Sequence, residues 1–362
     1  MQNKKAHYSW LDLVRFIAAL MVVCFHARAA SFVEYGLLPD NQHNVLIFGF
    51  FVVSRLGYEA VLAFFVLSGF LVGGKVIQQI KEGTFDLKSY TIDRTVRIML
   101  PLISALLLII CINFITGKPN NLFVIFGNLF SLQGIFVGTA TEPLWSLSYE
   151  VWFYVLMGAV AYLITKQKYA YHKTKYNSII TCLIILSVFM IFTKLEAVYL
   201  FVWLFGSLSI FYTPQKNKFV LIISIFLIIV SAILLQFTAG THSFNFSFLN
   251  LLPNRDVIVL MFALLMSIMI QQLLLFKPQK PFAVKIDKIG THWAKFSYTL
   301  YLTHFPILNL LNYLGFPKSE SVHTISLAYY IVNVIICLLS AYFIYLLFEK
   351  HTFAVKKYLK AL

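Results

Sequence analysis

The sequence predicts an all-helical protein with about ten transmembrane helices, organised as a single domain over residues 1–362. Composition is the first reason, because 60% of the 362 residues are hydrophobic and only 12% are charged, whereas about a quarter of a soluble domain is charged. The second reason is that the hydrophobic residues occur in long blocks, and a helix needs about 20 of them to cross a bilayer. This pattern excludes a soluble enzyme and a disordered chain. The four cysteines lie apart from one another inside apolar blocks, so no metal site is expected.

The individual helices are predicted by apolar blocks that begin and end at charged or turn-forming residues. Between the third and fourth blocks, the apolar stretch 122–138 is interrupted by Gly127, Asn128, Gln133 and Gly134. We therefore expect it to be a re-entrant or surface segment, with an additional span as the alternative. The ten predicted spans are residues 10–30, 57–77, 97–116, 143–166, 177–193, 196–213, 218–237, 256–276, 296–315 and 325–348.

The basic residues between these blocks predict that both termini are cytoplasmic. If the N-terminus lies inside, the inner segments hold 22 Lys and Arg residues and the outer segments hold 6. Positive residues concentrate in the cytoplasmic segments of membrane proteins. If the predicted number of helices were wrong by one, every later segment would change sides, and the basic residues would no longer concentrate on one side. The net charge of +15 is therefore explained by topology, and no nucleic-acid partner is expected.

The first block has an alternative interpretation as a cleaved signal peptide. A basic start and a short apolar run precede Ala27-Arg28-Ala29, which resembles a cleavage site. Asp12 and Arg15 interrupt the apolar run near its beginning, and this favours a helix that stays in the protein.

Ionisable side chains are concentrated in the first four predicted spans and the ninth. Each costs about 2.5–3.5 kcal/mol at the centre of a bilayer, so such residues usually mark a function or a structural pair. We therefore expect the functional site among these five helices. The residues are Asp12, Arg15, His26 and Arg28 in the first span, Glu59 in the second, Arg94 and Arg97 at the inner mouth of the third, Glu150 in the fourth and His304 in the ninth.

Helical geometry places Arg15 and His26 on one face of the first span. The two residues are 11 positions apart, so they return to within about 20° of each other and are separated by about 16 Å along the axis. Both can line one groove, with Arg15 near the cytoplasm and His26 toward the outside. Asp12 lies three residues before Arg15, where it can form an ion pair with it.

Glu150 and His26 lie at similar depths near the outer side, at about 10 Å and about 6 Å from the outer ends of their helices. A carboxylate that orients an imidazole is the usual support of a general base, and this predicts a catalytic pair. The alternative is that each group is satisfied separately within the bundle.

Arg94 and Arg97 lie on adjacent turns at the beginning of a helix. Two guanidinium groups beside the positive end of a helix dipole can form an anion site. The alternative is that they anchor the helix to lipid phosphates.

Five segments occur in one order along the chain. They are Arg15 with His26 (R-x10-H), Phe64–Leu71 (FFVLSGFL), Arg94 with Arg97 (R-x-x-R), Leu144–Glu150 (LWSLSYE) and Tyr301–Ile307 (YLTHFPI). In this combination the chain resembles the acyltransferase 3 family of membrane O-acyltransferases, from about Ser9 to Glu349. Many members carry an acid where this chain has Leu62, and Glu59, one turn away, is the expected substitute.

The resemblance implies the transfer of an acyl group, usually acetyl from acetyl-CoA, to a hydroxyl of an exported or cell-surface glycan such as lipopolysaccharide O-antigen or capsule. It implies a multi-pass protein of the bacterial plasma (inner) membrane, with membrane lipid, acetyl-CoA and the glycan acceptor as partners and no permanently bound cofactor. His26 and Glu150 would be catalytic, and Arg15, Arg94 and Arg97 would bind the donor.

Five further residues are expected to bind substrate or to support the site. Trp145 fits the acceptor path, with an interfacial anchor as the alternative. His304 fits the groove, with polar packing as the alternative. The five residues are Asp12, Glu59, Trp145, Tyr301 and His304.

Two mechanisms and one other class of function stay open from the sequence. His26 either takes the proton of the acceptor hydroxyl as this attacks the thioester, or carries the acyl group itself as a covalent relay. The same charged residues would also suit a proton-coupled secondary transporter or a glycan-export membrane protein, although no inverted repeat is visible.

Overall fold

The structure is a computed structural model that describes residues 8, 10–168, 175–238 and 254–361. In this part of the chain the regular structure is helical and contains no strand, which confirms the predicted all-helical fold. The helices are α1 (Leu11–Ser31), α2 (Val45–Ser54), α3 (Gly57–Ser68), the π-helical turn η3 (Gly69–Gly74), α4 (Lys75–Glu82), α5 (Leu87–Thr116), α6 (Leu122–Leu129), α7 (Trp145–Lys168), α8 (Lys175–Phe192), α9 (Val198–Leu208), α10 (Lys218–Thr238), α11 (Arg255–Leu275), α12 (Pro281–Ala294), α13 (Ser297–Tyr313), α14 (Thr324–Leu347) and α15 (Thr352–Ala361).

Each of the ten predicted blocks coincides with a helix of the structure. Among the described residues, seven helices are long and apolar enough to cross a membrane by length and composition, and the stretch from α2 to α4 counts as one of them. Two other blocks form shorter apolar helices, Ile179–Phe192 and Val198–Phe211, and α13 has 17 residues. The exact number of ten spans stays a prediction.

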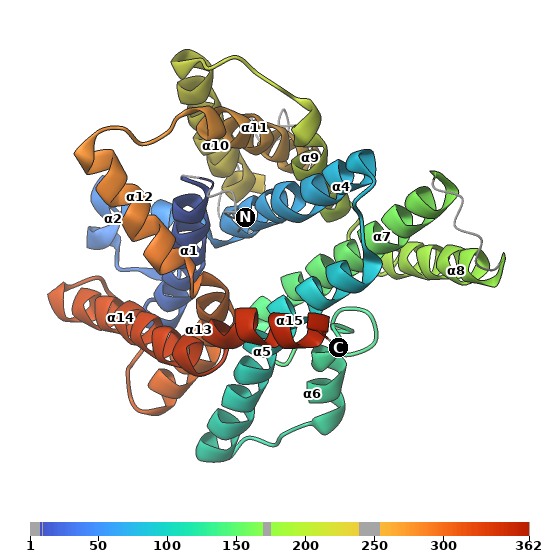
Figure 1. Ribbon diagram of the computed structural model, residues 1–362. Helices are drawn as coiled ribbons and strands as arrows, with labels where there is room; N and C mark the ends of the chain where they lie inside the picture. Colours follow the sequence, from blue (N-terminus) through green and yellow to red (C-terminus); the bar gives the residue numbers. More distant parts are fainter. Residues whose placement is uncertain (1–7, 9, 169–174, 239–253, 362) are drawn as a thin grey trace.

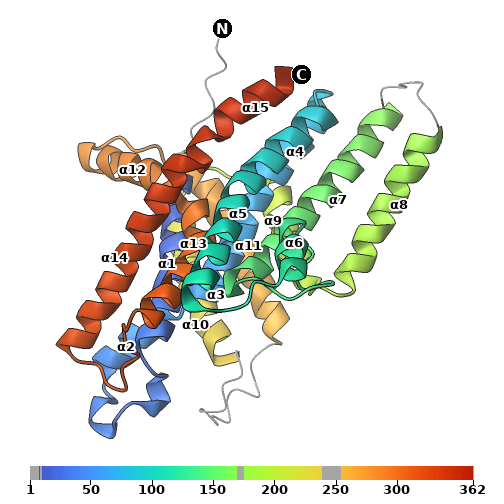
Figure 2. The ribbon, with the colours of Figure 1, turned by 90° about the horizontal axis from the view of Figure 1, so that it is seen from below.

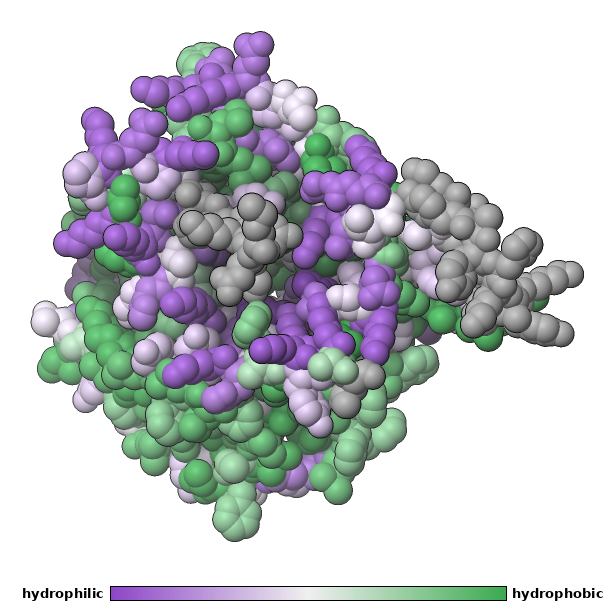
Figure 3. All heavy atoms as spheres, in the orientation of Figure 1, coloured by the Kyte–Doolittle hydropathy of each residue, from purple (hydrophilic) through white to green (hydrophobic). Residues whose placement is uncertain are grey.

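The long helices run side by side, and the beginning of α1 and helix α15 lie at the same end of the bundle (Figure 2). Because both ends lie on one side of the bundle, the chain is expected to cross the membrane an even number of times. Figure 1 looks along the bundle from that end, and hydrophilic residues gather on the same face (Figure 3). The membrane side to which this end belongs stays a prediction.

The segment after α5 does not form an additional span. Helix α6 has eight residues and is therefore about 12 Å long, which is too short to cross a bilayer. The Asn128 side chain donates hydrogen bonds to the Val124 and Gly138 carbonyls at 2.8 and 2.9 Å. Gln133 donates to the Leu144 carbonyl at 2.8 Å. The polar residues that interrupt the apolar stretch thus close the loop and fasten it to the beginning of α7.

Helix α12 was not predicted as a helix, because its residues were assigned to a basic inner segment. It lies across the end of α1 rather than along the bundle (Figure 2). The Trp10 backbone N–H donates to Asp287 Oδ1 at 3.1 Å, and Gly290 lies so close to Leu13 that a Cβ would be 2.7 Å from the Leu13 Cβ. These contacts hold the beginning of α1 in place.

Helices α3 and η3 pack closely against α9, and small residues lie at the contact. A Cβ on Gly69 would overlap the Trp203 carbonyl oxygen, and a Cβ on Gly73 would overlap the Ser207 hydroxyl. From the other side, a Cβ on Gly206 would overlap the Val66 carbonyl oxygen. The two backbones can therefore meet only where side chains are absent.

A Gly206→Ala substitution is expected to destabilise the protein by about 1–3 kcal/mol, because the added methyl group must push α9 away from α3. The thermal unfolding midpoint of the purified protein in detergent measures the effect. Gly74→Ala is the matched control, since its Cβ would meet its nearest neighbour, the Ser207 carbonyl oxygen, at an ordinary 3.6 Å. An equal fall of the midpoint for both variants would contradict this account.

Candidate active site

A central cavity of about 280 Å³ lies between helices from distant parts of the sequence. Its lining comes from α1, α3 with η3 and α4, α5, α7 and α13, which are the five predicted spans that hold the ionisable residues. The charged lining residues are Arg15, Lys75, Arg94, Arg97 and Glu150. Four cations and one carboxylate therefore face a largely apolar space, which favours an anionic ligand.

Two of the four cations have a carboxylate partner. Arg15 Nη1 lies 3.1 Å from Asp12 Oδ1, and this confirms the ion pair predicted within the first turns of α1. Arg97 Nη1 donates to Glu349 Oε1 at 2.5 Å, a pair that the sequence did not predict. Both pairs leave other guanidinium nitrogens available to a ligand.

Glu349 follows α14 in sequence, but its side chain accepts hydrogen bonds at the beginning of α13. Its side chain is 1% exposed, and its Oε2 accepts hydrogen bonds from the Thr299 N–H at 3.2 Å and the Thr299 hydroxyl at 2.6 Å. Thr299 is in the first turn of α13, where backbone N–H groups lack helical partners. The carboxylate thus joins α5, α13 and the end of α14, and it holds Arg97 at the cavity.

Arg94 and Lys75 have no ion pair or hydrogen bond within the described part of the chain. The Arg94 guanidinium lies over the Tyr154 ring, 5.7 Å from its centroid. Arg94 also lines two adjoining cavities, one of about 460 Å³ between α5, α7 and α8 and one of about 90 Å³ that Lys75 lines as well. Lys75 was not among the predicted site residues, and its position at the end of an apolar block gave no signal beyond the expected cytoplasmic charge.

Glu150 forms a network with neighbouring helices. Its Oε1 accepts a hydrogen bond from the Ser68 hydroxyl at 3.2 Å and another from the Tyr154 hydroxyl. The Ser68 hydroxyl also accepts from Trp203 Nε1 at 3.2 Å. Ser68 was not among the predicted site residues, and the structure brings its hydroxyl into contact with Glu150.

The ring of His26 contacts a second imidazole rather than Glu150. His26 Nδ1 lies 3.0 Å from His304 Nε2 and 3.1 Å from the Val22 carbonyl oxygen. The predicted direct support of His26 by Glu150 is therefore corrected. Depth along the membrane does not specify which helix is the neighbour, and α13 is one of the helices that pack along α1.

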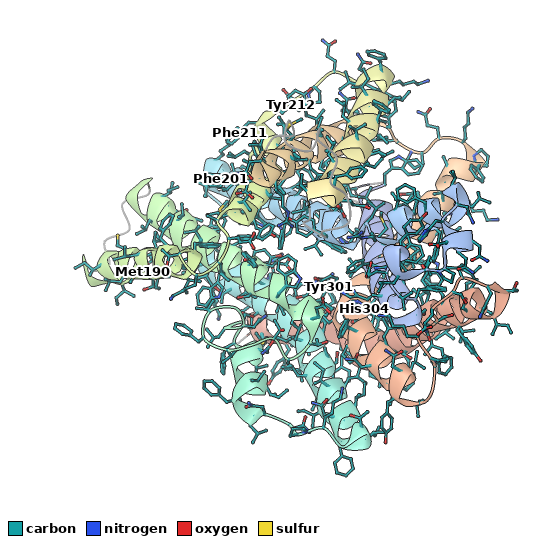
Figure 4. The ribbon with its side chains drawn as sticks, turned by 180° about the vertical axis from the view of Figure 1, so that it is seen from behind. Met190, Phe201, Phe211, Tyr212, Tyr301 and His304 are labelled. Carbon is teal, nitrogen blue, oxygen red and sulfur yellow. The ribbon has the colours of Figure 1, made fainter. Side chains whose placement is uncertain are left out.

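The histidine pair lies beyond the end of the cavity on α13. His26 does not belong to the residues that line the cavity, whereas Tyr301 does. Tyr301 precedes His304 by about one turn, and the centroids of their rings are 6.2 Å apart. Figure 4 shows both side chains close together near the middle of the bundle. Tyr301 therefore connects the lining of the cationic cavity with the histidine pair.

The remaining predicted residues lie around this site in different ways. The Tyr301 hydroxyl donates to the Pro143 carbonyl at 3.0 Å and lies 2.6 Å from the Ser146 hydroxyl, so it joins α13 to α7. Trp145 packs in an aromatic cluster beside the cavity, with the Tyr199 centroid 5.6 Å away. Glu59 is buried away from the cavity lining, and its Oε2 has no hydrogen-bond partner in the described part of the chain.

Comparisons with known proteins identify the family. A family model described as an acyltransferase domain matches residues 8–346, nearly the whole chain. No curated protein and no solved structure gave a significant match. Cations that can hold an anionic donor, and an imidazole that can accept a proton, are the groups that acyl transfer needs. The chain therefore belongs to the acyltransferase 3 family and is a multi-pass membrane protein.

Proposed function

We propose that this protein is a membrane O-acyltransferase that transfers an acyl group, acetyl from acetyl-CoA, to a hydroxyl of an exported or cell-surface glycan such as O-antigen or capsule. The membrane would be the bacterial plasma (inner) membrane. The observation that carries the proposal is the convergence of Arg15, Lys75, Arg94 and Arg97 on a cavity that ends beside the histidine pair.

The cations support an acyl donor with phosphate groups. Arg94 and Lys75 have no carboxylate partner among the described residues, and an arginine without a counter-ion beside an apolar cavity is suited to bind phosphate in a bidentate manner. Coenzyme A combines phosphates with a long uncharged arm that ends in the thioester. The phosphates would bind at Arg94 and Lys75, and the arm would extend through the cavity toward Tyr301.

The chemical step needs one base. The proton of the acceptor hydroxyl passes to His26 Nε2 while its oxygen attacks the thioester carbonyl carbon. The carbon–sulfur bond then breaks, and the coenzyme thiolate leaves and takes the proton back from the imidazolium. Glu150 lines the same cavity, and among the described residues its hydrogen-bond partners contact Oε1, so its Oε2 would accept a hydrogen bond from a bound substrate.

The activity is tested with radiolabelled acetyl-CoA. Inside-out membrane vesicles that contain the protein and the glycan of the host should incorporate label into the glycan, and vesicles without the protein should not. Mass spectrometry of the glycan would then identify the acetylated position. Equal incorporation with and without the protein would exclude the proposed function.

Arg94→Ala and Lys75→Ala are expected to raise the KM for acetyl-CoA, by about 10- to 100-fold for Arg94 and about tenfold for Lys75, since each removes a charge-assisted contact with phosphate. Initial rates at varied donor concentration measure the effect. Lys81→Ala, on the same helix α4 as Lys75, is the control. Lys81 lies outside the cavity lining, and its ammonium is 4.0 Å from the centroid of the Phe211 ring. An unchanged KM in both cavity variants would place the donor elsewhere.

A further inference from the structure

The hydrogen bonds of the two buried imidazoles determine which nitrogen of each ring carries the proton. His304 Nδ1 lies 3.0 Å from the Leu300 carbonyl oxygen, and His26 Nδ1 lies 3.1 Å from the Val22 carbonyl oxygen. A carbonyl oxygen only accepts hydrogen bonds, so both Nδ1 atoms must be protonated. In a neutral imidazole the other nitrogen then carries a lone pair.

This assignment makes the contact between the two rings directional. The lone pair of His304 Nε2 faces the proton of His26 Nδ1 across 3.0 Å, so His26 donates and His304 accepts. His26 Nε2 is then left as a bare nitrogen, with no hydrogen-bond partner among the described residues. One arrangement of protons satisfies all three contacts.

We propose that His304 is the positioning residue of His26: its neutral imidazole accepts the Nδ1 proton of His26 and thereby keeps His26 Nε2 unprotonated and available to the acceptor hydroxyl. This inference rests on the proposed acyl transfer for its chemical meaning. When His26 Nε2 takes the hydroxyl proton, the resulting imidazolium donates from Nδ1 to two acceptors, His304 Nε2 and the Val22 carbonyl. His304 then has the role that a carboxylate has in a nucleophile–base triad, which is to hold the tautomer and stabilise the charged ring.

The surroundings explain why an imidazole suits this position. His304 is 0% exposed, and a charged carboxylate at such a place inside a membrane protein carries a large desolvation cost. A neutral imidazole offers a lone pair without that cost. The Phe25 and Phe305 rings meet the His26 ring edge-on, at centroid distances of 4.8 and 5.1 Å, and restrict its rotation. The hydrogen bond and the aromatic contacts together orient the ring.

Two substitutions at the same position separate this role from simple packing. His304→Leu fills the space without an acceptor, and it is expected to lower kcat for acyl transfer by about 10- to 100-fold, with the KM for acetyl-CoA changed less than twofold. His304→Gln can place its Oε1 near the former Nε2, and it is expected to keep kcat within about fivefold of the wild type. Equal losses in both variants, or full activity of His304→Leu, would overturn the proposal.

A spectroscopic measurement tests the same inference without acyl transfer. Solid-state nitrogen NMR of ring-labelled histidine in proteoliposomes distinguishes protonated from bare imidazole nitrogens, and His26→Asn assigns the His26 signals by difference. Wild-type His26 should show a bare Nε2 and a protonated Nδ1, and His304→Leu should show a protonated fraction at Nε2. A protonated Nε2 in the wild type would overturn the proposal. If the wild type shows this tautomer but never acylates a glycan, the proposed function fails and the assignment of His304 stands.

Discussion

Replacing His26 with asparagine is expected to lower the rate of acyl transfer by a factor of about 10²–10⁴, which is the usual contribution of a general base. The Asn side-chain N–H can donate to the Val22 carbonyl and to His304 Nε2 in place of Nδ1, so the packing of α1 against α13 is preserved. The variant lacks any group at the position of Nε2. Initial rates of label transfer in proteoliposomes measure the loss.

The control for His26→Asn is His292→Asn on α12. His292 is exposed and outside the cavity lining, so the same change there should leave the rate unaltered. Equal amounts of both variants must elute as folded protein in detergent. If His26→Asn retained more than a tenth of the wild-type rate, another group would have to accept the hydroxyl proton.

Removing the carboxylate of Glu349 is expected to have the largest effect on stability. Glu349→Ala leaves the Arg97 guanidinium without its counter-charge and the Thr299 hydroxyl and N–H without their acceptor. The Glu349 side chain is buried, but the Arg97 side chain is 35% exposed, so water can partly solvate the unpaired guanidinium. The expected cost is therefore about 2–3 kcal/mol, below the roughly 3–5 kcal/mol of a fully buried pair. The thermal unfolding midpoint in detergent should fall accordingly.

A double variant separates the two roles of Arg97, which are the ion pair with Glu349 and the binding of the donor at the cavity. Replacing a buried ion pair on both sides with apolar residues is often neutral for stability, so Arg97→Leu combined with Glu349→Leu should recover most of the midpoint. The KM of the double variant for acetyl-CoA should still be higher than that of the wild type, because the Arg97 cation at the cavity is lost. Recovery of both quantities would show that Arg97 serves only the fold.

Local patterns predicted much of this site. The ion pair of Asp12 and Arg15 follows from their spacing on one helix, since residues three apart are neighbours on any α-helix. The helical class follows from apolar blocks that have the length of membrane-spanning helices. Both predictions concern properties that belong to one helix.

Contacts between helices were predicted less well. Glu150 and His26 have similar depths, but depth gives no information about lateral neighbours, and the partner of His26 is His304 on α13. Glu349 was missed because it lies beyond the last apolar block, where an acidic residue looks like an ordinary interfacial charge. Its function depends on how the end of α14 meets the beginning of α13.

The amino-acid order alone determined that the chain is helical and embedded in a membrane, which helices hold its ionisable side chains, and to which family it belongs. Hydropathy and motif spacing are local quantities, and the cost of placing charge in lipid makes the exceptions conspicuous. The tertiary structure decided which imidazole faces which, where Arg97 finds its counter-charge, and that Lys75 lies at the cavity. These pairings depend on which helices are adjacent, and adjacency is set by packing summed over the whole bundle.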